Sequence, residues 1–456
     1  MARRLPALAV PARALSGLAL AVATMVAVPS PAPAAAPPDC APPAPGQRFP
    51  TATPEQVQLD PAAVRDAVHY AATHLRLSVQ VFRHGCLVGA APQNALTLDV
   101  PWNVWSSTKS VVSMLTGIAE SQGALDLDDP IGDHLPARYG DAAHRAITIR
   151  QLLTETSGLD EAIISEAATI LTDPDVVHEA LAQPIEHEPG THFRYSQRTP
   201  DLLAFVVEQA VGEDLQAFAQ RELFTPIGIR STDYFWLRDR SGHTYGYANL
   251  FIRPRQYARL GLLMQHGGRW GDQQVVPADY LRRAETPTAT NGCYGFLFWT
   301  NAGEPCTGAS IPTAVTIDQR AIESAPHDLY AMVGAFQQNN FAIPSLDMTV
   351  SWTGLLGDTT VNNLSGLMSA LPADLYHEFF RRLMRGVEDV EVPDPGPLTL
   401  PDDFAVDPLA FADPALLLRG LVPTSRCNVL VCDGRVPLTG LLQNLRSITA
   451  AILAPR

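Results

Sequence analysis

The sequence has 456 residues, 46% of them apolar, which suits one large or two smaller globular domains. Its formal charge is -15, with 32 Lys and Arg residues against 47 Asp and Glu residues. Nucleic-acid binding needs clustered basic side chains that displace counterions from phosphates, so this balance argues against a nucleic-acid partner.

The N-terminus has the pattern of a secretory signal. Arg3 and Arg4 precede an apolar stretch over about residues 15–28, and small residues follow at 32–36. A membrane-spanning helix would need about 18 to 20 apolar residues, more than this stretch offers. We therefore expect a signal peptide over 1–34, a Pro/Ala-rich mature N-terminus over 35–54, and a secreted protein with no stable membrane anchor.

The six cysteines fit an exported protein, in which an even number usually forms disulfides. Proximity in the sequence suggests three pairs: Cys293 with Cys306, Cys427 with Cys432, and Cys40 with Cys86. No cysteine and histidine spacing is typical of zinc, and no His-Glu-x-x-His segment is present. We expect neither a metal nor another cofactor.

The first predicted elements are a hairpin and a helix. Apolar and polar residues alternate over 77–89 around Arg83-His84-Gly85, which predicts a β-hairpin. From Ser106 the apolar residues recur with helical spacing, and Gly123 marks the end of this helix. Lys109, the only lysine in the chain, lies three residues after Ser106. Residues at this spacing share a helix face, so the two side chains should be neighbours in the first turn.

Ser106 and Lys109 together suggest acyl transfer, because a serine nucleophile needs a base and arginine cannot supply one. An unperturbed lysine with a pKa near 10.4 is only about 0.04% neutral at pH 7, so Lys109 would have to be buried beside other polar groups. The alternative is that a serine caps the helix and Lys109 is solvated. The Gly-x-Ser-x-Gly arrangement of α/β-hydrolases is absent.

Later segments predict further regular elements. Residues 199–212 predict an apolar helix, 329–336 and 348–352 predict strands, and 372–385 predict an amphipathic helix. Four aromatic residues are candidates for a substrate pocket, although aromatics of this kind more often belong to the core, which we favour: Trp236, Tyr245, Tyr247 and Trp299.

The C-terminal part begins with a linker-like composition over 387–397, followed by an extension of unknown role over 398–456. Its last helix should pack on the main body or on a partner, through a side formed by apolar residues. These are Leu438, Leu441, Leu442, Leu445, Ile448 and Ile452.

The segment from Trp105 to Gly123 resembles the Ser-x-x-Lys helix of serine β-lactamases and penicillin-binding proteins. Successive stretches resemble landmarks of the class C branch and of related esterases. These are residues 125–130, 147–153, 156–159, 193–197 and 223–229. The resemblance covers residues 55–386 as one serine hydrolase domain. It implies an α/β (α+β) β-lactamase/transpeptidase-like fold, with an antiparallel sheet from both chain ends, flanking helices and an inserted helical region.

The resemblance also implies roles for residues later in the chain. In the Tyr-x-Asn motif of this family, Tyr195 stands at the tyrosine and Gln197 at the asparagine. The third motif, Lys-Thr-Gly or His-x-Gly, falls on Ala335-Phe336-Gln337, which has neither the basic residue nor the glycine. The backbone N–H groups of Ser106 and Gln337 can still form an oxyanion hole.

Three interpretations follow. The first is a secreted serine hydrolase that cleaves a small-molecule or peptide-like ester or amide through an acyl-enzyme on Ser106, with Lys109 and Tyr195 as the proton relay. The missing basic residue of the third motif favours a substrate without a carboxylate at that point. The second is a peptidoglycan D-Ala-D-Ala carboxypeptidase or a β-lactamase. The third is a catalytically impaired cell-envelope binding protein on the same fold. The sequence leaves the oligomeric state open.

Overall fold

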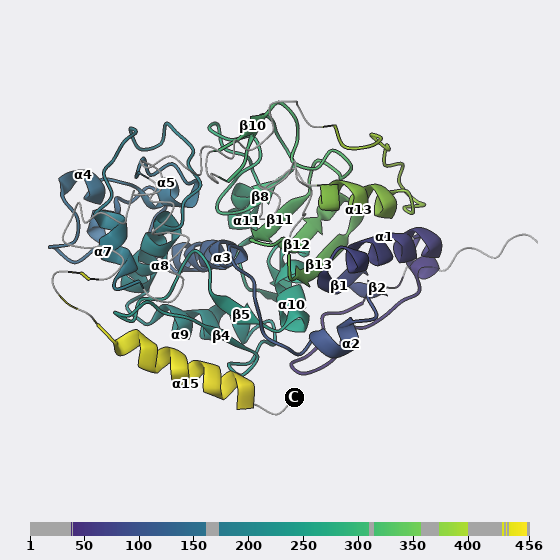
Figure 1. The fold of residues 1–456 in the computed structure, drawn as a ribbon, viewed down its shortest axis with the longest axis horizontal. Helices are drawn as coiled ribbons and strands as arrows, with labels where there is room; N and C mark the ends of the chain where they lie inside the picture. Colours follow the sequence, from purple (N-terminus) through teal and green to yellow (C-terminus); the bar gives the residue numbers. More distant parts are fainter. Residues whose placement is uncertain are drawn as a thin grey trace, which may run out of the picture. The chain divides into compact units, whose positions relative to one another are not determined.

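A computed structural model describes residues 38, 40–160, 173–309, 314–356, 374–399, 431–432, 435 and 437–453 (Figure 1). The predicted signal peptide lies outside these residues, as does Cys427.

The central element is a six-stranded antiparallel sheet in the order β2-β1-β13-β12-β11-β8. Its strands come from both ends of the domain: β1 Arg76–Arg83, β2 Cys86–Ala90, β8 Trp299–Thr300, β11 Tyr330–Gly334, β12 Gln338–Ile343 and β13 Met348–Gly354. Because β1 pairs with β13, the first and last strands of the domain lie side by side. The predicted hairpin is β1 and β2, joined by His84 and Gly85 in left-handed conformations.

Helices cover both faces of this sheet (Figure 1). α1 Pro61–Thr73 and α13 Asp374–Met384 pack together on one face, while α3 Ser107–Ser121 and α10 Pro254–Gln265 pack on the other. The alternation along β12 explains this arrangement, since successive side chains of a strand point to opposite faces. Phe341 packs against Phe380 of α13, whereas Asn340 donates a hydrogen bond to the Tyr257 carbonyl of α10.

A mostly helical region separates the two halves of the sheet, as the sequence predicted. Its helical elements are η2 Ile131–Asp133, α4 Ala142–Arg145, α5 Ile149–Leu153, α7 Val176–Leu181, α8 Arg198–Val211, α9 Leu215–Ala219 and η3 Gln220–Phe224. A three-stranded sheet follows, in the order β3-β5-β4: β3 Trp102–Asn103, β4 Tyr234–Trp236 and β5 Leu250–Ile252. The smaller elements are η1 Pro54–Val57, α2 Asn94–Thr97, β6 Arg269–Trp270, β7 Gln273–Gln274, α11 Ala278–Ala284, β9 Cys306–Thr307, β10 Thr316–Ile317 and η4 Pro344–Leu346. The predicted fold class is confirmed.

Two of the predicted disulfides are present, Cys40–Cys86 and Cys293–Cys306. Cys432 is also disulfide-bonded. The stretch predicted as a linker is fastened to the domain, because Arg83 forms an ion pair with Asp389 and Arg381 forms one with Asp394.

The C-terminal helix, α15 Thr439–Leu453, packs on the main body, one of the two outcomes expected. Of the predicted apolar side, Ile448 packs partly buried against the core, whereas the leucines are turned outward, with Leu442 61% and Leu445 62% exposed. The buried contact is made by small and amide side chains: Asn444 exchanges hydrogen bonds with the backbone of Arg238, and Gly440 lies against the Asp239 carbonyl. A side chain at position 440 would overlap that carbonyl, so close approach has decided which face is buried. Among the described residues, the helices are all too short or too polar for a bilayer-crossing span.

Candidate active site

Ser106 stands at the junction between β3 and α3. The chain turns sharply there, because Trp105 has a left-handed φ of 48°, and its N–H donates to the Asn103 side chain at 2.9 Å. A bulky residue in this region costs about 1–3 kcal/mol and is held there by its surroundings. The turn leaves Ser106 partly accessible, while the helix residues that follow it are buried.

Lys109 lies beside Ser106, as the helical spacing predicts. Its Nζ is 3.3 Å from the Ser106 Oγ, and the lysine is only 1% exposed. The alternative of a solvated lysine is therefore wrong. The Nζ lies 4.3 Å from the ring centre of Tyr195 and 5.6 Å from that of Tyr247, so the amine is surrounded by aromatic side chains rather than by water.

Tyr195 and Gln197 reach the same point from the segment that leads into α8. The Tyr195 phenol lies near enough to the Ser106 hydroxyl for that hydroxyl to act on its pKa, and the Gln197 side-chain oxygen accepts a hydrogen bond from Lys109 Nζ. Burial raises the pKa of the Tyr195 phenol well above its usual value, although the Ser106 hydroxyl acts to lower it. The longer glutamine side chain thus still reaches the lysine, and Tyr195 is a neutral hydrogen-bonding group in the resting site.

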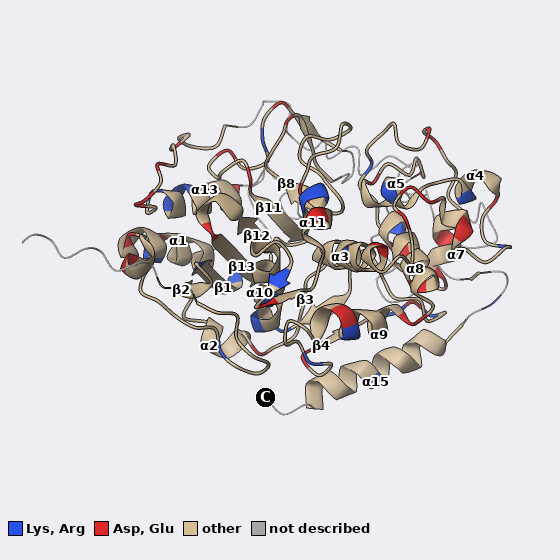
Figure 2. Cartoon of the chain, turned by 180° about the vertical axis from the view of Figure 1, so that it is seen from behind, with Lys and Arg blue, Asp and Glu red and all other residues tan. Residues whose placement is uncertain are grey.

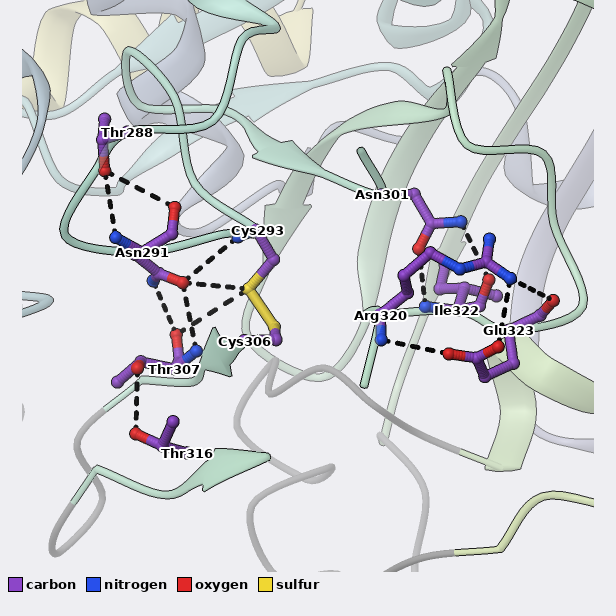
Figure 3. Close-up of a disulfide and its surroundings, with 10 residues drawn as sticks. All are labelled: Thr288, Asn291, Cys293, Asn301, Cys306, Thr307, Thr316, Arg320, Ile322 and Glu323. Carbon is purple, nitrogen blue, oxygen red and sulfur yellow. Dashed lines mark hydrogen bonds and ion pairs between the residues drawn. A yellow bond between two sulfur atoms is a disulfide. The ribbon is translucent and has the colours of Figure 1, made fainter. Parts of the chain in front are cut away.

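An aromatic wall stands behind Tyr195. The Trp299 ring is 5.6 Å from the Tyr195 ring, and the Tyr294 ring meets Tyr195 edge-on at 6.0 Å. The disulfide Cys293–Cys306 fixes the loop that carries both rings. Figure 3 shows the buried Asn291 side chain beside this disulfide, where its oxygen accepts from the N–H groups of Cys293 and Thr307. Trp299 and Tyr247, assigned from the sequence to the core, therefore also contact the site.

The turn between β11 and β12 carries Gln337 up to the start of α3. Gly334 has no side chain where the Val104 carbonyl approaches it, and the Phe336 ring packs 5.3 Å from the Trp105 ring. Within the described ranges, the backbone N–H groups of Ser106 and Gln337 donate to no protein acceptor. The side-chain amide of Gln337 is buried, again with no hydrogen-bond partner in the described part of the chain.

Two residues that the sequence did not single out hold the helix start in place. The Tyr257 hydroxyl of α10 donates to Ser107 Oγ at 2.7 Å, and Ser107 Oγ donates to the Gln338 carbonyl at 3.1 Å. Ser107 thereby links α3 to α10 and β12. A serine beside the predicted nucleophile was the only sequence signal for this link.

A buried ion cluster follows Gln197 in the chain. Arg198 forms ion pairs with three carboxylates: Asp173 at 2.6 Å, Asp201 at 2.8 Å and Glu179 at 3.1 Å. Figure 2 shows acidic and basic residues side by side around α7 and α8. Burial raises the pKa of Asp201 to about 7, although Arg198 acts to lower it. Asp201 also accepts from the Tyr247 N–H, so the cluster holds the backbone at Tyr247 and lies next to Gln197, the two residues that approach Lys109.

In the part of the chain that the structure describes, two groups of side chains have the spacing of metal ligands: Asp175, His178 and Cys432, and Asp175, Asp239 and His243. These side chains are instead bonded to other protein groups. Cys432 is disulfide-bonded, and His243 Nδ1 hydrogen-bonds with Asp239 at 3.0 Å. Burial alone would lower the pKa of His243, yet Asp239 and Asp175 raise it to about 9, so the group is an imidazolium held by carboxylates.

Known proteins provide an independent comparison. A family model described as Beta-lactamase matches residues 66–360, well over half of the chain. Protein flp of Staphylococcus aureus is 26% identical over 148 residues, which cover 31% of this chain and 30% of that protein. Esterase EstB of Burkholderia gladioli is 29% identical over 179 residues, which cover 34% of this chain and 45% of the esterase. The chain thus matches less than half the length of either relative.

Among solved structures, a candidate beta-lactamase from Bacteroides dorei superposes with a TM-score of 0.55 at 16% identity. The superposition covers 71% of this chain and 99% of that one, so the two share their fold. Because the family model matches residues 66–360, the chain belongs to the Beta-lactamase family.

Proposed function

We propose that the protein is a serine hydrolase that cleaves an ester or amide through an acyl-enzyme on Ser106. The observation that carries the proposal is the position of the Ser106 hydroxyl, which lies 3.3 Å from the Nζ of the buried Lys109. Tyr195 lies at the same point, since the Ser106 hydroxyl acts to lower the pKa of its phenol. A nucleophile with a base in reach, itself held by further polar groups, is the arrangement required for covalent catalysis.

In the first half of the reaction, the neutral Lys109 amine takes the Ser106 proton, directly or through Tyr195, while Oγ attacks the substrate carbonyl carbon. The oxyanion that forms is stabilised by the backbone N–H groups of Ser106 and Gln337. The bond to the leaving group then breaks, and Tyr195 delivers a proton to the departing oxygen or nitrogen. The Ser106 acyl ester remains.

In the second half, water attacks this ester and Tyr195 acts as the base that takes the water proton. The acyl group leaves as a carboxylic acid, and the proton returns to the Ser106 oxygen. Gln197 keeps Lys109 in place throughout, because its side-chain oxygen accepts from Nζ.

The third motif supports a neutral substrate. Ala335 and Phe336 place no positive charge on the β11–β12 turn, where a substrate carboxylate would need one. We therefore favour an ester or amide without a carboxylate at that position over penicillins or peptidoglycan termini. The partial match to Esterase EstB supports the same choice.

Purified protein tests this proposal with short p-nitrophenyl esters and a chromogenic cephalosporin. We expect ester hydrolysis that Ser106→Ala abolishes, and cephalosporin turnover that is slower by at least about 10-fold. Ser121→Ala, at the far end of the same helix, is the matched control that keeps full activity. Faster cephalosporin turnover would favour the β-lactamase alternative, and turnover of neither substrate would favour the binding protein.

We also infer that the protein functions outside the cytoplasm. The disulfides support this, because cytosolic thiols are kept reduced. N-terminal sequencing of the protein secreted by a host that recognises the leader should start near Ala35. An intact Met1 on the mature protein would contradict the inference.

A further inference from the structure

We propose that Arg76 is a positioning residue that aims the Gln337 N–H at the oxyanion, an inference that rests on the proposed function. Arg76 is the first residue of β1, and it is separated from Gln337 by 261 positions in the sequence. Its guanidinium group is buried at the back of the β11–β12 turn, where Arg76 is only 1% exposed.

The guanidinium binds the turn through main-chain carbonyls. Nη1 donates to the Phe336 oxygen at 2.9 Å and to the Gln337 oxygen at 2.7 Å, while Nε donates to the His74 oxygen at 3.2 Å. Nη2 donates to the Leu356 carbonyl just beyond β13. Arg76 therefore ties the turn to β1, on which it lies, and to the chain just beyond β13.

Peptide geometry shows how these contacts set the direction of the Gln337 N–H. In a trans peptide the C=O and the following N–H point in opposite directions. Because the Phe336 carbonyl is drawn towards Arg76, the Gln337 N–H must point away from Arg76. Phe336 packs against Trp105, the residue before Ser106, so the turn adjoins the candidate site.

The turn needs such a hold because its backbone is strained. Phe336 and Gln337 have φ values of 59° and 58°, in the left-handed region that a glycine adopts at no steric cost. The glycine of the His-x-Gly pattern would have met this need at position 337. Here the sequence has Gln337, and two charged hydrogen bonds from Arg76 stabilise the conformation instead.

Gly354, the last residue of β13, makes room for this arrangement. It is paired with Arg76 in the sheet register, and a Cβ at position 354 would overlap the guanidinium. Position 337 of the turn thus has no glycine, whereas position 354 has one, which leaves space for the Arg76 guanidinium.

The same strand provides a matched control. Arg83, at the other end of β1, is also 1% exposed and also donates to main-chain carbonyls, those of Val57, Gln58 and Leu346. Seven residues of extended strand separate it from Arg76 by about 23 Å. Substitution of Arg83 removes a buried guanidinium of the same kind without touching the turn.

The test compares Arg76→Met and Arg76→Lys with Arg83→Met, using the full chain and a p-nitrophenyl ester. Loss of one oxyanion donor costs about 10²- to 10³-fold in kcat, so we expect Arg76→Met to lower kcat by about 10²-fold while KM changes less than about threefold. Arg76→Lys keeps the positive charge but loses the planar guanidinium group, and we expect kcat to fall by at least about tenfold. Arg83→Met should lower the melting temperature and leave kcat unchanged.

A rescue experiment separates positioning from general stability. Gln337→Gly in the Arg76→Met background allows the turn to adopt positive φ without the hydrogen bonds from Arg76, so kcat should recover by about tenfold or more. A folded Arg76→Met or Arg76→Lys protein with kcat within threefold of the wild type overturns the proposal, and so does the failure of Gln337→Gly to restore any activity. An inactive wild type that no serine probe labels would overturn the proposed function and this inference together, whereas an active wild type with unaffected Arg76 variants overturns this inference alone.

Discussion

Lys109 is held in surroundings quite unlike those of a surface lysine. It is buried with its Nζ near the rings of Tyr195 and Tyr247, and it donates hydrogen bonds to the Ser106 hydroxyl and to the Gln197 side-chain oxygen. Arginine in this position would keep the charge and much of the length, but it could not release a proton. The chemistry proposed for Lys109 therefore depends on its amine rather than on its charge.

Lys109→Arg tests this dependence. We expect kcat for ester hydrolysis to fall by at least about 10³-fold, because the base is lost, while the protein remains folded by circular dichroism. A variant that kept more than a tenth of the wild-type kcat would show that the positive charge alone is sufficient.

Tyr195 gives a second prediction at this scale. Burial raises the pKa of its phenol, so Tyr195 is protonated in the resting enzyme and gives up its proton only as part of the pair with Lys109. The rate should rise with pH as the pair loses one proton, and Tyr195→Phe should lower kcat by about 10²- to 10⁴-fold. Rates that stay flat from pH 5 to 9 in the wild type would argue against the pair as the base.

At the scale of elements, the site is assembled from several segments, and local sequence patterns predict only some of them. The helix that carries Ser106 and Lys109 could be predicted because a period of 3.6 residues puts positions three apart on one face. Tyr195 and Gln197 have no such local signal, and only the resemblance to a known family pointed to them. The Tyr257 hydrogen bond to Ser107 joins residues 150 positions apart, which periodicity cannot predict.

α15 shows where a pattern-based expectation is only partly met. The helix packs on the main body as expected and Ile448 of its apolar side is partly buried, but Gly440 and Asn444 make the buried contact while the leucines face outward. Close approach at a glycine and two satisfied amide hydrogen bonds outweigh hydrophobic burial at this interface.

Substitutions on α15 test this orientation. Asn444→Ala leaves the Arg238 backbone groups without their partners, so we expect the free energy of unfolding to fall by about 1–3 kcal/mol in urea titrations. Leu442→Ala, at an exposed position, is the control and should change stability by less than about 0.5 kcal/mol. The reverse order of effects would mean that the leucine side is the buried one.

At the scale of the whole molecule, the arrangement depends on contacts between distant parts of the chain. β1 pairs with β13, and the hydrogen bonds from Arg76 to the β11–β12 turn join residues 260 and 261 positions apart. The fold class followed from ordered family landmarks, but contacts between the chain ends have no sequence periodicity to indicate them. The departures at Ala335-Phe336-Gln337 were visible in the sequence, although the arginine that accommodates them was not.

His243 makes one contribution to the pH dependence of global stability. Its pKa is raised to about 9 in the folded protein by Asp239 and Asp175, against about 6.5 when unfolded. The stabilisation is therefore complete below pH 6.5 and is lost as the pH rises through 9, a loss of about 3 kcal/mol. The difference in unfolding free energy between the wild type and His243→Gln should be largest at pH 6 and smallest near pH 9.5. A difference that does not change with pH would contradict the raised pKa.

The most direct test of the whole account is the intact mass of the protein after incubation with a fluorophosphonate probe. We predict a single adduct on the wild type that peptide mapping assigns to Ser106, no adduct on Ser106→Ala, and labelling of Lys109→Ala slower by at least about 10²-fold. A wild-type protein without an adduct, or one whose adduct persists in Ser106→Ala, would contradict the claim that Ser106 is the nucleophile and Lys109 its base.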